Sequence, residues 1–207
     1  LEIMMYSAKR DLQGMLGATN RGIDFFQGIK NTNNAYLFTI YIQKIVCCLQ
    51  LRRYDEGLEA INIATPLIGK GSYNYFIVKH CRFLMQMHDQ SYTSAYFTFI
   101  ECKKERVFDK AAFNIAESFR VAEAYLYYLI SIHKLNGDKK SFRINKFLNE
   151  VPVFSKDKRV TNVPILIIQA LYLIQRKQYN RVIDRLDSLT RYTSRYFRRN
   201  EAFRSNC

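Results

Sequence analysis

The chain of 207 residues contains no tryptophan, only 8 glycines and only 3 prolines. Glycine and proline make up about 4% and about 1.5% of it, below the usual averages of about 7% and about 5%, which argues against collagen-like, loop-rich and disordered architectures. A chain of this length can bury about 70% of the surface that it exposes when unfolded, so it needs no disulfide or metal to fold. The scarcity of glycine and proline therefore predicts long regular elements.

Paired cysteines and long apolar runs are also lacking. The five cysteines form no CxxC pair, and their number is odd, so the sequence indicates neither a disulfide framework nor a zinc module. This use of cysteine favours a reducing, cytoplasmic setting. The most apolar stretch, residues 163–174, is shorter than the roughly 18 apolar residues of a membrane helix, so we expect no membrane partner. Because the chain begins with Leu1 and ends just after a helical pattern, we expect it to be a fragment of a longer protein.

Acidic residues are few, with 18 Asp and Glu against 32 Lys and Arg and a net charge of +14. The excess lies in the second half: residues 1–102 hold 10 basic and 8 acidic side chains, and residues 103–207 hold 22 and 10. Such asymmetry is found in proteins that bind nucleic acids, acidic proteins or anionic surfaces. It is also found on the solvated faces of ordinary helical proteins, so charge alone leaves both interpretations open.

Apolar residues recur at helical spacing along almost the whole chain, and no alternation of period two is sustained. This pattern predicts an all-α fold with more than about 60% helix, against a usual share of about one third. We expect one helix near residues 5–29. It is followed, within a single helical-repeat domain of residues 1–207, by antiparallel hairpins near residues 35–68, 73–103, 108–150 and 162–199.

The second helix of each hairpin is expected to open with an aromatic residue that anchors it to the first helix. The three clear anchors are Tyr54, Tyr92 and Tyr179, and Phe142 is a weaker fourth. Residues three, four and seven places after each anchor share its helix face and are predicted to point inward. In two of the three clear cases the middle inward position of the preceding helix is small, Cys81 and Ala170, and small residues there would let paired helices approach closely.

The segment at residues 50–58, QLRRYDEGL, resembles the turn and the start of the second helix in the tetratricopeptide repeat family, and residues 178–183 look like a degenerate copy. The resemblance covers roughly residues 35–199. It implies a right-handed α-solenoid of stacked helical hairpins with a concave groove that binds proteins or peptides. The chain departs from the family at Arg52 and Lys177, where a small residue is usual, and its anchor spacings exceed the family period of about 34 residues.

Motifs for catalysis and for cofactor binding are not found. The sequence has no GxSxG nucleophile elbow, no HExxH zinc site and no GxGxxG dinucleotide loop. His80 and Cys81 are neighbours on a helix and point to different faces, so they are not predicted to share a metal. The sequence therefore predicts a protein that is not an enzyme, with no catalytic residue, no metal and no cofactor.

The first helices of the hairpins would line the groove that the resemblance implies. The candidate peptide-binding residues there are polar: Gln50, Arg82, Gln86 and Gln175. A side-chain amide can donate to and accept from the backbone of an extended peptide. Ordinary helix-forming residues near a helix end explain these amides equally well. The apolar groove positions could also pack on a second copy of the chain, which makes a homodimer an alternative.

A basic surface is the other candidate binding site. Its arginines lie on the last predicted helix, which ends near residue 199: Arg181, Arg185, Arg191, Arg195, Arg198 and Arg199. Guanidinium groups suit bidentate contacts with phosphates and carboxylates, and tyrosines interleaved among them can stack on bases. The surface fits RNA or an acidic protein, and a solvated helix face is the simpler alternative.

Taken together, these patterns predict a non-catalytic scaffold that binds a protein or a peptide, with an acidic peptide among the candidates. Two alternatives remain at this point. One is a nucleic-acid-associated helical protein that uses the basic second half. The other is the ligand-sensing part of a regulator, as the resemblance to peptide-sensing members of the family implies.

Overall fold

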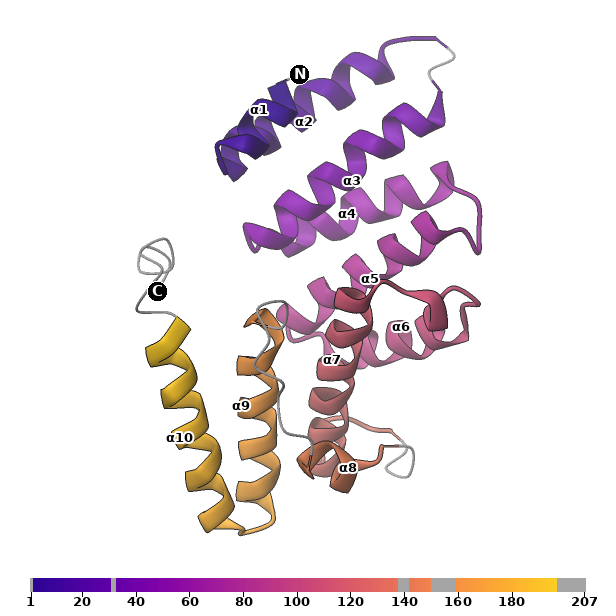
Figure 1. The fold of residues 1–207 in the computed structure, drawn as a ribbon. Helices are drawn as coiled ribbons and strands as arrows, with labels where there is room; N and C mark the ends of the chain where they lie inside the picture. The colour runs from indigo at the N-terminus through magenta and orange to yellow at the C-terminus, as the bar shows by residue number, and fades with distance from the viewer. Residues whose placement is uncertain (1, 31–32, 138–141, 150–158, 197–207) are drawn as a thin grey trace. The chain divides into compact units, whose positions relative to one another are not determined.

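A computed structural model of the chain describes residues 2–30, 33–137, 142–149 and 159–196 (Figure 1). Within those ranges the chain is about 80% helical and forms no strand, which confirms the predicted all-α class. Every helix of the described ranges is too short or too polar to cross a lipid bilayer.

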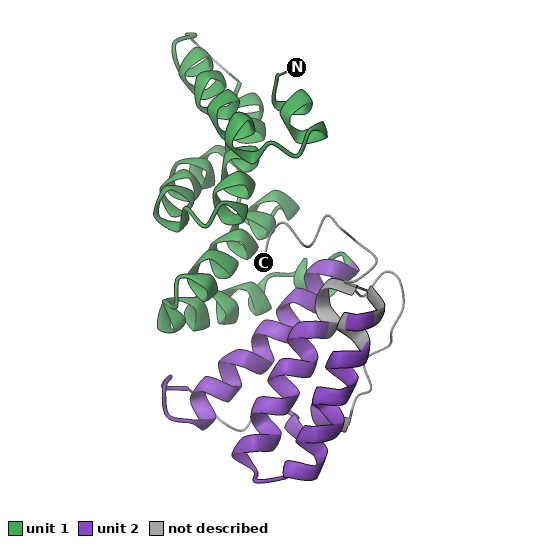
Figure 2. Ribbon diagram, turned by 90° about the vertical axis from the view of Figure 1, so that its left-hand side faces the viewer, with its two compact units in different colours: residues 1–112 green, residues 113–207 purple. Residues whose placement is uncertain are grey.

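The described helices fall into two compact units, residues 1–112 and residues 113–207 (Figure 2). The sequence pattern runs on without interruption across residue 112 and for that reason predicts one domain. Each unit is described by itself below.

Unit 1 is built from three pairs of helices in sequence order. They are α1 (Glu2–Ala8) with α2 (Leu12–Gln27), α3 (Asn34–Gln50) with α4 (Tyr54–Ala64), and α5 (Tyr73–His88) with α6 (Tyr92–Lys104). Short 3₁₀ turns, η1 (Thr65–Leu67) and η2 (Phe108–Lys110), follow α4 and α6. Helix α3 packs against α2, α4 and α5, so the pairs are joined through a shared core. The two hairpins predicted near residues 35–68 and 73–103 are present.

The single helix predicted near residues 5–29 is wrong, because the chain breaks there into α1 and α2. Arg10 has a φ of 57°, a left-handed conformation that cannot continue a right-handed helix. Asp11 then caps α2, its side chain accepting a hydrogen bond of 2.8 Å from the backbone N–H of Gly14. The apolar residues have helical spacing on both sides of the break, so hydrophobic periodicity alone does not reveal it.

One backbone turn recurs five times in the described chain. Its left-handed residues are Arg10, Arg52, Gln90, His133 and Lys177. In each case the N–H of that residue donates to the carbonyl three places before it, and the next N–H donates to the carbonyl five places before it. In four of the five, the second helix begins two places later, at Leu12, Tyr54, Tyr92 and Tyr179. The three clear aromatic anchors therefore hold equivalent positions, whereas Phe142, nine places after His133, does not.

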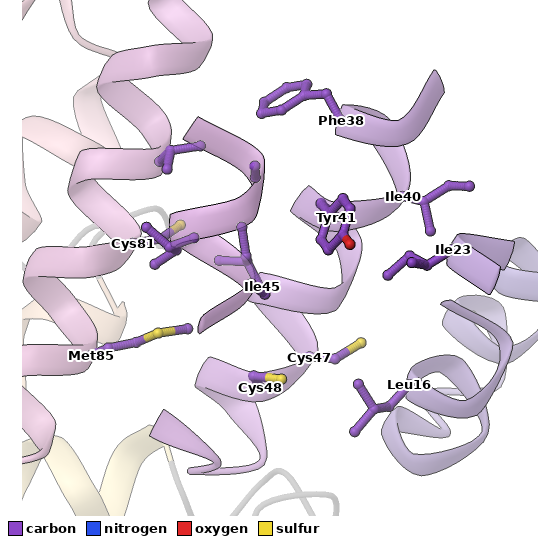
Figure 3. Close-up of a cluster of buried hydrophobic side chains, with 14 of the residues drawn as sticks. Leu16, Ile23, Phe38, Ile40, Tyr41, Ile45, Cys47, Cys48, Cys81 and Met85 are labelled. Carbon is purple, nitrogen blue, oxygen red and sulfur yellow. The ribbon is translucent and has the colours of Figure 1, made fainter. Parts of the chain in front are cut away.

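The core of unit 1 runs without interruption from α2 to α5 (Figure 3). Cys47 and Cys48, adjacent on α3, are both fully buried and face different neighbours. Cys47 lies toward Leu16 of α2, and Cys48 lies toward Met85 of α5. Burial raises the pKa of Cys48 to about 11, so this side chain remains a neutral thiol that packs as a small apolar group.

Unit 2 consists of α7 (Phe113–Ser131), α8 (Ile144–Asn149), α9 (Arg159–Gln175) and α10 (Tyr179–Tyr196). The hairpin predicted near residues 108–150 corresponds to α7 and the six-residue α8, and that near residues 162–199 corresponds to α9 and α10. Tyr172 and Leu173 of α9 pack with Val182 of α10 in the core of this unit.

Candidate functional site

A pocket of about 410 Å³ opens in unit 1 between α5, α6 and the start of η1. We call it the α5–α6 pocket. Its lining combines apolar, aromatic and charged side chains: Thr65, Tyr75, Val78, Lys79, Arg82, Gln86, Ser94, Phe97, Thr98 and Glu101. Val78 and Thr98 are buried, and Phe97 is largely exposed. The pocket therefore has an apolar floor and an accessible aromatic ring.

Arg82 is the half-buried cation of this pocket. Its guanidinium Nη2 donates a hydrogen bond of 2.7 Å to the side-chain oxygen of Asn62, a neutral group. Within the described residues, no carboxylate lies within 4.0 Å of Arg82. Burial lowers the pKa of Arg82, because a desolvated guanidinium charge is less stable than a hydrated one. The charge is thus partly removed from water and has a neutral partner.

Lys79, one helical turn before Arg82, has a different environment. Its Nζ lies 2.8 Å from a carboxylate oxygen of Glu105 and 3.5 Å from one of Glu101, and 4.8 Å from the centre of the Tyr75 ring. Burial acts against the ammonium charge, but the hydrogen bond and the charge of Glu105 outweigh it and raise the pKa of Lys79. Lys79 is therefore ion-paired within the protein, whereas Arg82 is hydrogen-bonded to a neutral side chain.

Gln86 extends the same face of α5 toward the end of the helix. Its amide oxygen accepts a hydrogen bond of 2.8 Å from the hydroxyl of Thr98 on α6. Among the described residues the amide nitrogen of Gln86 makes no hydrogen bond, so it can donate to a ligand. Two of the four predicted peptide-binding residues, Arg82 and Gln86, therefore line one pocket.

The other two candidates lie elsewhere. Gln50 is exposed at the end of α3, two places before the left-handed residue Arg52, and Gln175 stands two places before Lys177. Gln86 stands four places before Gln90, so the three glutamines are not equivalent along the hairpins. Sequence spacing alone does not reveal this shift, because helix ends are uncertain without the turn geometry.

Gln175 lines a second pocket, of about 350 Å³, in unit 2. There its amide oxygen accepts a hydrogen bond of 3.0 Å from the hydroxyl of Ser131. Tyr127 and Phe142 stack at the wall of this pocket, with ring centres 5.2 Å apart and an angle of 7° between the rings. The Tyr172 hydroxyl donates to the backbone carbonyl of Ala124 at 3.0 Å. The aromatic rings are thus held by contacts within unit 2.

The candidate basic surface is described only in part. Arg181 donates to the Gln178 side chain at 2.9 Å, and Arg191 is exposed. Arg185 is partly buried and donates a hydrogen bond of 3.0 Å to the backbone carbonyl of Leu148, near the end of α8. Burial lowers the pKa of Arg185. Of the remaining candidates, the side chain of Arg195 and all of Arg198 and Arg199 lie outside the described residues.

Sequence reasoning missed most of the α5–α6 pocket, including Tyr75, Lys79 and Glu101. The signal is present in the sequence as a stripe on α5 at residues 75, 79, 82 and 86, which share one helix face. A matching stripe on α6 runs through residues 94, 98 and 101. Two stripes alone do not identify a pocket, because only the packing of α5 on α6 turns them toward each other.

Comparison of the chain with known protein families, with curated proteins and with solved structures finds no match. The resemblance to the tetratricopeptide repeat family therefore stays a prediction, and the functional argument rests on the geometry of the described residues.

Proposed function

We propose that the chain is a non-catalytic scaffold that binds an acidic peptide in the α5–α6 pocket. We further propose that its hairpins stack as a right-handed solenoid of the tetratricopeptide type. The recurring turn supports this arrangement, since it sets the same connection between helices in four hairpins. The packing of α3 on α5 as well as on α4 also supports it, because stacked hairpins bring successive first helices together.

The observation that carries the proposed ligand is the contrast between Arg82 and Lys79. Lys79 has carboxylate oxygens of Glu101 and Glu105 within 4 Å, whereas half-buried Arg82 hydrogen-bonds the neutral Asn62 and is influenced by Glu101 only beyond ion-pair distance. A carboxylate of a bound peptide would supply the missing counter-charge, and charge-assisted hydrogen bonds of this kind contribute about 1.5 to 3 kcal/mol. Glu101, exposed at the same pocket, would favour a ligand with one carboxylate over a densely acidic one.

The rest of the pocket fits an extended peptide around that carboxylate. The amide nitrogen of Gln86 can donate to a backbone carbonyl, and the exposed ring of Phe97 offers apolar contact to a neighbouring side chain. The cavity volume of about 410 Å³ accommodates a few side chains and not a folded domain.

The test is fluorescence anisotropy with short labelled peptides of leucine and serine in which one position is glutamate, glutamine or lysine. We expect the glutamate peptide to bind best and Arg82→Gln to weaken it by about tenfold or more, as loss of one charge-assisted contact predicts. Arg106→Gln is the matched control, because it removes one positive charge from an exposed site outside the pocket. Equal losses in both variants, or no preference for glutamate, would contradict the proposal.

Nucleic-acid binding by the basic surface is the alternative that the same assay separates. Arg185, central to that surface, is engaged by the carbonyl of Leu148, which lowers its availability to phosphate. A labelled single-stranded RNA serves as the probe at low and at physiological salt. Tight binding that falls steeply with salt and that Arg82→Gln leaves unchanged would support the alternative.

A further inference from the structure

The recurring turn gives a common numbering for the hairpins, counted from the left-handed residue. Nine places after it, the second helices carry Thr19, Ile61, Phe99 and Leu186. The first three expose at most 1% of their surface, whereas Leu186 on α10 exposes 50%. One position is therefore core in three hairpins of unit 1 and surface in the last hairpin of the described chain.

A second position shows the opposite pattern. Five places before the left-handed residue, the first helices carry Met5, Cys47, Met85 and Tyr172. Cys47, Met85 and Tyr172 expose at most 4% of their surface, and Met5 on α1 exposes 50%. Here the first hairpin is the exception.

Unit 1 shows what covers this first-helix position inside the chain. Ile61 of α4 and Met85 of α5 belong to one core cluster, and the end of the Met85 side chain lies against Gly57 of α4. Between α2 and α3, Cys47 lies toward Leu16, which stands six places after the left-handed residue (Figure 3). Phe99 instead packs on Phe83 of its own hairpin, with ring centres 5.8 Å apart, and Tyr172 packs on Tyr128 of α7. The second helix of one hairpin thus packs on the first helix of the next.

The faces around Met5 and Leu186 are the two halves of this interface. On α1, Met4 is exposed next to Met5, and on α10, Tyr179 and Ile183 are exposed next to Leu186. The residues equivalent to Ile183 are Leu16, Leu58 and Tyr96, all buried or half-buried in unit 1. Each face is apolar. Met5 has the register of Cys47 and Met85, which lie against the preceding helices α2 and α4, and Ile183 has the register of Leu16, which lies toward Cys47 of α3.

We propose that copies of this chain associate head to tail, with the α10 face of one copy packed on α1 of the next, as α4 packs on α5 within unit 1. The two faces differ, so the contact is heterologous and leaves one free face at each end of an assembly. Association then produces a series of growing oligomers and not only a closed dimer. This inference is independent of the peptide-binding pocket, which lies on neither face.

The strength and the salt dependence of the contact follow from the side chains at its border. Val182 on α10 has the position that Gly57 has on α4. The valine side chain occupies the space that the Met85 side chain fills beside Gly57, so the contact between copies is less deeply packed. We therefore expect the oligomers to dissociate on dilution. Charges of both signs, Asp187 and Arg191, are exposed on α10, so association should persist in high salt.

Sedimentation velocity over a wide range of protein concentration, in high salt and after nuclease treatment, tests the proposal. We expect the wild-type chain to form a concentration-dependent series, and Met5→Glu and Leu186→Glu each to stay monomeric. Both sites are exposed, so an unchanged circular dichroism spectrum is expected and confirms that each variant folds. Ile183→Glu is a second variant with the same expectation. Phe97→Glu, at an exposed residue of α6 that belongs to neither face, is the control that should still associate.

Mixing the two variants decides between modes of association. Met5→Glu retains an intact α10 face and Leu186→Glu retains an intact α1 face, so an equimolar mixture should form a one-to-one complex that grows no further. A symmetric dimer that only one of the two substitutions dissociates would overturn the head-to-tail arrangement. A wild-type chain that is monomeric at every concentration, or a Phe97→Glu variant that no longer associates, would overturn it as well.

Discussion

The side chain of Met85 on α5 lies where a β-carbon on Gly57 of α4 would have to be. A Cβ at residue 57 would overlap the terminal methyl of Met85. It would stand 2.7 Å from the Met85 sulfur and 3.1 Å from the Cβ of Cys48 on α3. Three helices therefore meet at a single glycine, and the absence of a side chain there lets α4 approach α3 and α5.

Gly57→Ala should destabilise the protein by roughly 1 kcal/mol, because strain in the filled core outweighs the gain of about 1 kcal/mol in helix propensity. Gly17→Ala on α2 is the control. There the nearest atom to a new Cβ is Nη1 of Arg21 at 3.5 Å, an ordinary contact, so stability should rise by about 1 kcal/mol. Urea titration followed by circular dichroism measures both, and a stabilised Gly57→Ala variant would show that α4 and α5 do not approach so closely.

Gln90→Gly should stabilise the chain by roughly 0.5 to 1 kcal/mol. Gln90 has a φ of 62°, a conformation that costs a residue with a Cβ about 1 to 2 kcal/mol, and glycine adopts it freely at some cost in unfolded-state entropy. Gln90→Val should destabilise, because a β-branched side chain tolerates this conformation least. Thermal unfolding compares the three proteins, and a lower melting temperature for Gln90→Gly would contradict the left-handed turn.

Stability should fall as the pH drops below about 6.5, because of His80. Burial lowers the pKa of this side chain from 6.5 to about 4 in the folded protein, so the unfolded chain binds the proton more tightly. The contribution of neutral His80 to the free energy of unfolding is complete above about pH 6.5. It is lost as the pH falls toward 4, and about 2 kcal/mol of it is gone at pH 5. His80→Gln should remove that part of the pH dependence. Urea titrations at several pH values measure the free energy of unfolding of both proteins. If that free energy changes with pH equally in wild type and variant, His80 titrates normally.

Arg185→Ala should destabilise unit 2 by roughly 1 to 2 kcal/mol, because the carbonyl of Leu148 would lose its charged donor. Arg191→Ala, at an exposed position of the same helix, should change stability by less than about 0.5 kcal/mol. Urea titration measures the free energy of unfolding of both variants. Equal small effects would mean that Arg185 belongs to a solvated surface, as the basic-surface interpretation requires.

The helical fold was predictable because each helix carries its own periodicity and because glycine and proline are rare. Helices α4, α6 and α10 begin at Tyr54, Tyr92 and Tyr179 as predicted, since each is the first apolar residue after a short polar turn. The predicted inward packing is wrong for α10, where Tyr179, Ile183 and Leu186 expose 60%, 57% and 50% of their surface. The break at Arg10 was not. A left-handed arginine has no marker in the sequence, and the apolar spacing on its two sides is consistent with one long helix.

Only a few of the residues that line the α5–α6 pocket could be predicted from the sequence. Arg82 and Gln86 lie on the face that the sequence selects, but the pairing of Lys79 with Glu105 joins residues 26 positions apart. The sequence selects Arg82 by its predicted groove position, and it does not reveal that Lys79, on the same helix face, is ion-paired. The engagement of Arg185 by Leu148, 37 positions away, is equally invisible to periodicity.

The sequence by itself determined the all-α class and the positions of the hairpins, because helix formation depends on residues three and four places apart. The tertiary structure decided which apolar positions are covered and which remain on the surface. Ile61 and Leu186 have the same place in their hairpins and similar side chains, yet one is fully buried and the other is half exposed. Ile61 lies in a core to which α2, α3 and α5 also contribute, so burial of this kind is a property of neighbouring elements and not of the residue.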